Sequence, residues 1–288
     1  IKLTANDMEL GIETKIEGEI AERGIIALDA KIFSEIVRRL PDNDISIETD
    51  GTDSVKIQCE KINFTIPGKN ADEFTFLPEV ERLNCVTLSQ FTLKEIIRQT
   101  IFSISDNENN KMMAGELLEI NGNNLRIVSL DGHRISICKI VLKDSYDSIK
   151  VVVPGKTLNE VNKILLDSFE PVKIGISKNQ ALFEMDNCKI VTRILDGEFL
   201  NYKNVIPSNW ETRVKVNKNS IQDSFERISL ISSSSIEKEK KYPVKVNVDI
   251  GKVTISCTNQ TGDAKEELYV STEGKNLEVG FNPKHFLD

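Results

Sequence analysis

The stretch richest in chemical groups is "SLDGHRIS" at residues 129–136, where an acid, a glycine, a histidine and an arginine follow one another. His133 is a candidate general base oriented by Asp131, because imidazole titrates near neutral pH. The simpler reading is an Asp-Gly turn between two strands, which accounts for Asp131 and Gly132 but not for His133 and Arg134. No nucleophile stands beside His133. A hydrolase is therefore weakly supported.

A second candidate is "VPGKT" at residues 153–157, which resembles the end of a phosphate-binding loop between a strand and a helix. The first glycine of such a loop is missing, because position 150 is lysine. Lys31 and Lys284 hold the same place as Lys156 in two similar segments. The lysine therefore marks the start of a helix rather than a nucleotide site, and we expect no cofactor.

Those segments belong to an internal repeat of about 125 residues, which is the size of a domain. "ALDAKIFSEIVRRL" from residue 27 matches "VVPGKTLNEVNKIL" from residue 152, and "GFNPKHFLD" opens a third copy. Likewise "VTLSQFTLKEIIRQTIFSIS" from residue 86 matches "VKVNKNSIQDSFERISLISS" from residue 214, and Asp7 corresponds to Asp131. We predict domains at 1–83, 84–210 and 211–288. The first copy lacks its front half and the third its back half, which suggests a fragment of a three-domain protein.

Hydrophobic periodicity predicts the fold class. Alternating strands indicate antiparallel sheets with one buried face, and the residues expected on that face include Ile45, Ile47, Val55, Ile57, Cys59, Ile62, Phe64, Ile66, Val244, Val246 and Val248. Single apolar stripes indicate helices packed on one side of a sheet, with Ile32, Phe33, Ile36, Val37 and Leu40 in one, Leu93, Ile96, Ile97 and Thr100 in another, and Leu158, Val161 and Leu165 in a third. We predict an α+β fold with two helices per repeat.

The composition excludes several classes of protein. Acidic residues outnumber basic ones by 45 to 37 and the formal charge is −8, so DNA contact requires a local basic surface. The cysteines have no spacing that suits zinc or a disulfide framework: Cys59, Cys85, Cys138, Cys188 and Cys257. No run approaches the roughly 18 apolar residues of a membrane span. We expect a soluble, cytoplasmic protein without a metal.

The polar faces of the predicted helices are basic, although the protein is acidic. They carry Lys31, Arg38, Arg39, Lys94, Arg98, Lys156, Asn159 and Lys163. If the repeats form an arc with the helices inside, these side chains line a concave surface that contacts phosphates without reading base sequence. For any single helix, an ordinary solvated surface remains the alternative.

Three motifs resemble the bacterial sliding clamps, the β subunits of DNA polymerase III. "SLDGHRISIC" resembles a T-D-G-H-R-L turn of that family, "ILDGEFLNYKNVIP" its D-G-x-F-P-D-Y segment, and "GFNPKHFLD" the opening of its last helix. The resemblance covers the whole chain and implies three clamp domains. It further implies a non-catalytic subunit that forms a head-to-tail homodimer, a ring of six domains around double-stranded DNA, with helices lining the hole.

The resemblance also implies a pocket that binds peptides of the polymerase III catalytic subunit, the clamp loader, repair polymerases and mismatch-repair proteins. Its residues match or neighbour Met113, Leu130, Asp131, Gly132, His133, Arg134, Ile135, Leu200, Asn204, Val205, Tyr242, Asn282 and His285. Leu130, Leu200 and His285 replace the threonine, proline and tyrosine of the family, and the family's C-terminal pocket strand is absent, so we expect the pocket to be either incomplete or altered in its peptide preference.

Two pairs of apolar residues fall where clamps meet in the dimer. Phe64 and Ile66 lie on a predicted strand of the first repeat, and Leu230 and Ile231 follow a predicted helix of the third. The alternative is that these four are core residues of the single chain. An alternative function is a non-enzymatic interaction scaffold of the same fold that does not encircle DNA.

Overall fold

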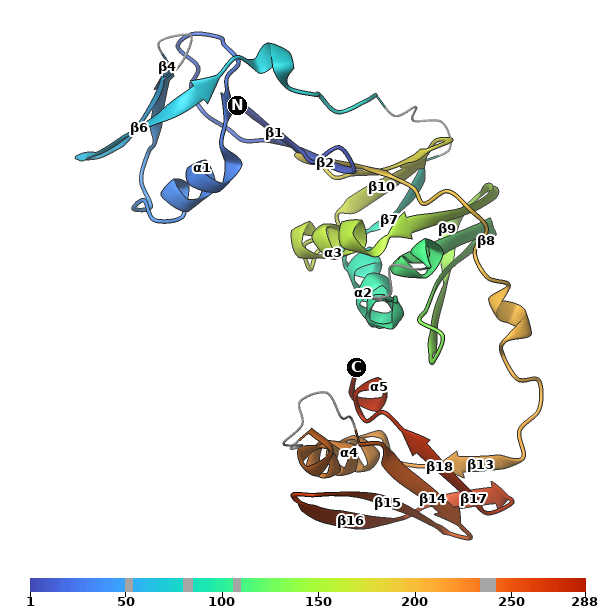
Figure 1. Cartoon of the computed structure of the whole chain (residues 1–288). Coiled ribbons are helices and arrows are strands. Elements are labelled where there is room, and N and C mark those ends of the chain that lie inside the picture. The colour runs from blue at the N-terminus through green and yellow to red at the C-terminus, as the bar shows by residue number, and fades with distance from the viewer. Residues whose placement is uncertain (50–53, 80–84, 106–109, 234–241) are drawn as a thin grey trace. The chain divides into compact units, whose positions relative to one another are not determined.

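The computed structural model describes residues 1–49, 54–79, 85–105, 110–233 and 242–288, and the chain divides into two compact units (Figure 1). Unit 1 runs from Ile1 to Phe199 and unit 2 from Leu200 to Asp288. Within the described ranges, every strand pairing is antiparallel, as the alternating sequence predicts. The predicted boundary between residues 83 and 84 lies outside these ranges.

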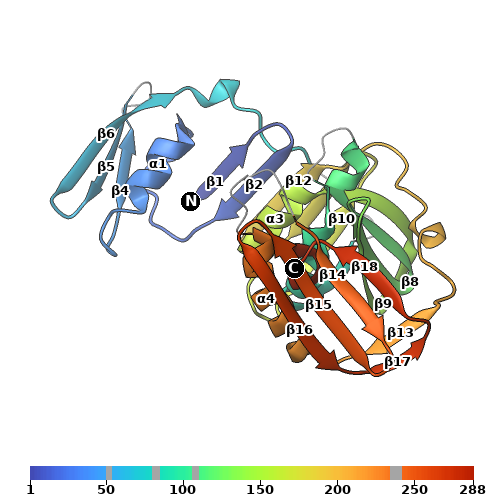
Figure 2. The same cartoon turned by 60° about the horizontal axis from the view of Figure 1, so that its bottom comes forward.

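The largest sheet of unit 1 joins the start of the chain to a segment far from it in sequence. Its six strands, in spatial order, are β1 (Lys2–Asn6), β2 (Leu10–Lys15), β12 (Cys188–Arg193), β11 (Gln180–Glu184), β10 (Pro171–Ile176) and β7 (Val86–Ser89). Ile12 pairs with Ile190 where β2 meets β12, and Figure 2 shows the β1–β2 hairpin extending that sheet. The hairpin covers an edge of β12 that would otherwise expose unpaired backbone groups.

A long hairpin and two helices complete the larger core of unit 1. They are β8 (Gly115–Leu130), β9 (Ile135–Pro154), α2 (Gln90–Thr100) and α3 (Gly155–Ile164), with 3₁₀ turns η2 (Ile101–Ser103) and η3 (Lys111–Ala114). The predicted stripes of both helices are buried, as the periodicity requires: Leu93, Ile96, Ile97 and Thr100 on α2, and Leu158, Val161 and Leu165 at α3. Because these stripes face the same core, α2 and α3 pack together.

The remaining part of unit 1 is a small sheet carrying one helix, with the 3₁₀ turn η1 (Ala71–Glu73) after it. The strands are β3 (Ala27–Leu28), β6 (Ile62–Lys69), β5 (Ser54–Cys59) and β4 (Ser46–Thr49), and the helix is α1 (Ala30–Val37). A small core forms from Ile36, Val55, Ile57 and Ile66.

Some expected core positions of this small sheet are exposed. The prediction of burial was wrong for Ile32, Val37, Ile45, Ile47, Ile62 and Phe64. The buried residues of the small core lie only at Ile36 of the eight-residue α1, on β5 and on the later half of β6, so Ile32 and Val37 of α1 and the apolar residues of β4 and the start of β6 stay exposed.

Unit 2 repeats the plan with a four-stranded sheet and a long helix. Its elements are the 3₁₀ turn η4 (Tyr202–Asn204), β13 (Thr212–Lys215), α4 (Lys218–Ser233), β14 (Val244–Asp249), β15 (Lys252–Asn259), β16 (Gly262–Tyr269), β17 (Ser271–Gly274), β18 (Leu277–Phe281) and α5 (Lys284–Leu287). The predicted face of Val244, Val246 and Val248 is buried. The Phe286 ring of α5 stacks on Phe225 of α4 at 4.1 Å, which holds a helix too short to be stable alone.

The repeat is visible in the helix starts. α1 begins at Ala30, α3 at Gly155 and α5 at Lys284, so Lys31, Lys156 and Lys284 all lie in a first turn. Mixed helices and antiparallel sheets in repeated units confirm the predicted α+β fold.

Candidate functional site

The "SLDGHRIS" segment is the turn between β8 and β9, organised by the Asp131 carboxylate. Oδ1 of Asp131 accepts hydrogen bonds from the backbone N–H of His133 at 2.9 Å and of Arg134 at 3.1 Å. Gly132 adopts φ +89°, a conformation that side chains rarely allow. Burial acts to raise the pKa of Asp131, but these N–H groups and the Arg134 guanidinium together lower it. The carboxylate therefore serves as a fixed acceptor that shapes the turn.

Arg134 connects this turn to the end of α2. Its Nε donates to Oδ2 of Asp131 at 3.0 Å, and its Nη2 donates to the backbone carbonyl of Phe102 in η2. The guanidinium also lies over the Phe102 ring, 5.3 Å from its centroid. The simple turn reading left Arg134 unexplained, and this anchoring explains it. Exposed His133 lies at the rim of the turn.

The turn between β1 and β2 has the same geometry, as the repeat predicts. Oδ1 of Asp7 accepts from the backbone N–H of Glu9 at 3.1 Å and of Leu10 at 2.8 Å. Met8 takes the place of Gly132, with φ +75°. Oδ2 of Asp7 differs from its counterpart, because it binds Nζ of Lys156 at 2.6 Å. The Lys156 ammonium and the Leu10 N–H lower the pKa of Asp7 to about 2.

These matched turns give opposite stability predictions. Met8→Gly should raise the free energy of unfolding of unit 1 by about 1 kcal/mol, because glycine relieves a left-handed conformation at an exposed side chain. Gly132→Ala should lower it by a similar amount, since an added Cβ meets no atom within 4 Å and the cost is backbone strain alone. Urea unfolding of both variants measures the difference. Shifts of the same sign would contradict this account.

The predicted pocket draws residues from both units, and each set is described in its own unit. In unit 1, Leu130 is buried at the end of β8, while Met113 in η3 and Ile135 at the start of β9 are half-buried. The Met113 carbonyl accepts from the Ser105 N–H at 2.8 Å, which holds η3 beside the segment after η2. Leu130 and Ile135 therefore flank the turn that Arg134 anchors.

The unit 2 residues lie in three segments, around η4, before β14 and at the start of α5. Leu200 and Val205 are 48% and 56% exposed around η4, where Asn204 lies, although neighbouring Tyr202 is buried. Nδ2 of Asn282 lies 3.3 Å from Nε2 of His285, and Oδ1 of Asn282 accepts from the Lys284 N–H. The Asn282 side chain therefore binds the first N–H group of α5. Tyr242 is half-buried against the unit 2 core.

The predicted basic residues lie on α1, α2 and α3 or directly after α1, and all except half-buried Lys94 are exposed: Lys31, Arg38, Arg39, Lys94, Arg98, Lys156, Asn159 and Lys163. Five of their seven Lys and Arg side chains lie beside a carboxylate. For example, Arg98 binds Glu95 through two nitrogens at 2.9 and 3.0 Å, and Lys163 binds Glu160 at 2.8 Å. The basic surfaces are thus partly neutralised within the chain.

The nucleotide-loop reading of "VPGKT" is not supported by the geometry. The first residue of α3 is a glycine for a packing reason. A Cβ atom at Gly155 would overlap the Ile104 side chain and lie 3.0 Å from the Ala114 carbonyl oxygen. Lys156 pairs with Asp7. In the described part of the chain, no group of three or more His, Cys, Asp or Glu residues is placed to hold a metal ion.

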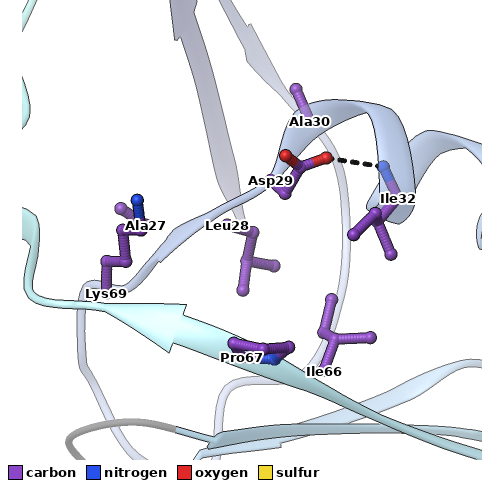
Figure 3. A pocket seen from close by; sticks show the side chains of 8 residues that line it. All are labelled: Ala27, Leu28, Asp29, Ala30, Ile32, Ile66, Pro67 and Lys69. Carbon is purple, nitrogen blue, oxygen red and sulfur yellow. Dashed lines mark hydrogen bonds between the residues drawn. The ribbon is translucent and has the colours of Figure 1, made fainter.

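The four predicted dimer residues differ in exposure, and Leu230 and Ile231 lie within α4 rather than after a helix, because α4 continues to Ser233. Phe64 and Leu230 are 39% and 68% exposed, whereas Ile66 is buried and Ile231 packs against the unit 2 core. Ile66 also lines a cavity of about 380 Å³ between α1 and the strands β3 and β6 (Figure 3). Above it, Oδ1 of Asp29 accepts from the Ile32 N–H and caps α1.

Sequence reasoning missed Glu116 on β8. This side chain is fully buried, and neither carboxylate oxygen has a hydrogen-bond partner among the described residues. Burial raises its pKa to about 8, while neighbouring Thr100, which acts in the opposite direction, donates its hydroxyl to the Ile96 carbonyl. An acid within the apolar run "GELLEI" was the available signal.

No helix in the described ranges has both the length and the apolar character needed to cross a membrane.

The chain is built of repeated α+β units that carry an arginine-anchored turn and basic helix faces. Family models of the DNA polymerase III beta subunit match in order: the N-terminal domain at 1–78, the central domain at 87–201 and the C-terminal domain at 203–288. The beta sliding clamps of Staphylococcus epidermidis and Staphylococcus aureus are 31% and 30% identical, each over 99% of this chain and 78% of theirs.

Solved structures agree with this match. A putative DNA polymerase III beta subunit from Eubacterium rectale has a TM-score of 0.93 and 52% identity, and the sliding clamp of Bacillus subtilis has 0.91 and 30%. Both alignments cover 99% of this chain and 77% of the other. The chain therefore belongs to the DNA polymerase III beta subunit family, the bacterial sliding clamps. Members of this family are non-catalytic subunits.

Proposed function

We propose that this protein is a processivity factor: a homodimer that closes around double-stranded DNA and tethers a replicative polymerase. The observation that carries the proposal is the ordered match of all three clamp domains. Basic helix faces support contact with phosphates, independent of base sequence. Processivity then comes from the topological link, because a closed ring slides without breaking a tight bond at each step. This function is favoured over that of a scaffold that does not encircle DNA.

We further propose that the thirteen predicted pocket residues bind a short peptide with a glutamine followed by leucine and an aromatic residue. The exposed Leu200 and Val205 offer apolar area for the peptide, and the Asp131 turn offers a rigid wall. Burying two apolar side chains contributes roughly 3–6 kcal/mol before ordering costs, which suits exchangeable partners. The proposed partners are the polymerase III catalytic subunit, the clamp loader, repair polymerases and mismatch-repair proteins.

The proposal includes the domain division 1–83, 84–210 and 211–288, a cytoplasmic location, and a head-to-tail dimer that uses Phe64, Ile66, Leu230 and Ile231. The exposure of Phe64 and Leu230 allows them to contact a second chain directly. Ile66 and Ile231 are packed in the cores of their own units and would hold these two side chains in place.

Retention on DNA with blocked ends tests the topological link. Protein is allowed to thread onto a linear duplex carrying biotin at both ends, and streptavidin then closes the ends. We expect retention at least about tenfold longer than on open duplex, because a ring escapes over free ends. Reversing Arg38, Arg98 and Lys163 to glutamate should shorten retention, since phosphate contacts are lost. Equal retention on open and blocked duplex would support the scaffold instead.

A further inference from the structure

The cations proposed to face DNA are held by carboxylates of the same chain. Five of the seven have a carboxylate oxygen within 3 Å: Arg39 with Glu35 at 2.8 Å, Lys94 with Asp167 at 2.9 Å, Arg98 with Glu95 at 2.9 Å, Lys156 with Asp7 at 2.6 Å and Lys163 with Glu160 at 2.8 Å. Within the described part of the chain, Lys31 and Arg38 have no such partner. The pairing recurs on α1, α2 and α3.

The pairs Glu35–Arg39, Glu95–Arg98 and Glu160–Lys163 contribute little to folding, because exposed ion pairs three or four residues apart are weak. Arg98 and Lys163 both remain 67% exposed, whereas their partners Glu95 and Glu160 are 33% and 37% exposed. The cation therefore projects beyond its carboxylate, where a phosphate can reach it. A phosphate that arrives must compete with the carboxylate and is also repelled by it.

We propose that Glu35, Glu95 and Glu160 are built-in competitors of the DNA phosphates that keep the grip of these helices on duplex DNA weak. The inference rests on the proposed function, since it requires the helices to face DNA. When a paired cation contacts a phosphate, fewer counterions leave the DNA than with an unpaired cation, because the charge of the paired cation is already balanced by its carboxylate. A surface that holds the DNA phosphates weakly at every position along the duplex offers little resistance when the protein slides.

The three glutamates are spaced to serve one cation each. Glu35 lies four residues before Arg39, and Glu95 and Glu160 lie three residues before Arg98 and Lys163, positions that share one helix face. Replacing each with glutamine removes the charge and keeps the shape. The control is the triple Glu211→Gln, Glu267→Gln and Glu278→Gln, whose carboxylates pair with lysines of unit 2 strands or their flanks. Both triples change the net charge equally.

The test is the salt dependence of affinity for a short open duplex, measured by fluorescence anisotropy. The triple variant Glu35→Gln, Glu95→Gln and Glu160→Gln is called the helix triple. For this variant we expect the slope of log affinity against log salt concentration to be steeper by about 2 to 3, because each cation freed from its carboxylate adds roughly 0.9. Affinity at low salt should rise at least about tenfold, and the control triple should match the wild type. If the slope and the affinity changed equally in both triple variants, the change in net charge alone would explain the result and the inference would be overturned.

An unchanged slope in the helix triple would also overturn it. Retention of wild-type protein on end-blocked duplex, measured in parallel, separates this failure from failure of the proposed function. If the wild type is retained and the helix triple behaves like it, only the competitor role of the glutamates is wrong. If the wild type is not retained, both proposals are wrong.

Discussion

Glu116→Gln is expected to remove most of the pH dependence of stability of unit 1 between about pH 5 and 8. Burial raises the folded-state pKa of Glu116 to about 8, from an ordinary value of 4.5. A group with a raised pKa stabilises the fold fully below its unfolded pKa, and that stability is lost as the pH rises through the folded pKa. The wild type should therefore lose on the order of 4 kcal/mol across this window.

The glutamine variant mimics the protonated acid and should be more stable than the wild type at pH 8. Hydrogen exchange of α2 backbone amides at pH 5.5 and 8 measures this locally, because the Thr100 hydroxyl and Glu116 lie at the end of that helix. Glu267→Gln is the matched control, since Lys252 and Lys265 lower the pKa of this exposed carboxyl and it titrates below the window. Parallel pH profiles for wild type and Glu116→Gln would contradict the assignment.

The double variant Arg134→Ala and Leu200→Ala is expected to weaken binding of a glutamine-leucine-phenylalanine peptide by roughly 100-fold, with about 1.4 kcal/mol lost at each position. Without Arg134, the β8–β9 turn loses its contact with the Phe102 carbonyl and the wall is no longer held. Without Leu200, the peptide loses an exposed apolar surface. Fluorescence anisotropy with a labelled peptide measures the change.

The matched control for that pair is Arg227→Ala with Leu166→Ala. Arg227 binds Glu266 through two nitrogens, and Leu166 is 62% exposed, so the same side-chain types are removed outside the predicted pocket. Peptide affinity should be unchanged in this control. Thermal unfolding of both double variants shows whether they are folded. Wild-type affinity in a folded Arg134 and Leu200 variant would remove the pocket assignment.

The turn at the centre of the candidate site could be predicted because its geometry depends on local patterns. The repeat aligns two short turns that contain Asp7 and Asp131. In the structure each of these aspartates accepts hydrogen bonds from the backbone N–H groups two and three residues after it. The stripes of α2 and α3 followed from helical periodicity alone. The same periodicity overstated burial on α1, because it cannot tell whether an element covers a face.

The sequence by itself determined the antiparallel α+β class, the helix starts around Lys31, Lys156 and Lys284 and the basic faces, since each depends on residues a few positions apart. It also determined the repeat, because similar segments recur about 125 residues apart in the printed sequence. The tertiary structure alone decided that β2 pairs with β12, that Lys156 binds Asp7 and that Glu116 is buried without a partner. Such contacts depend on how distant segments meet in space, and neither strand alternation nor helical spacing carries that information.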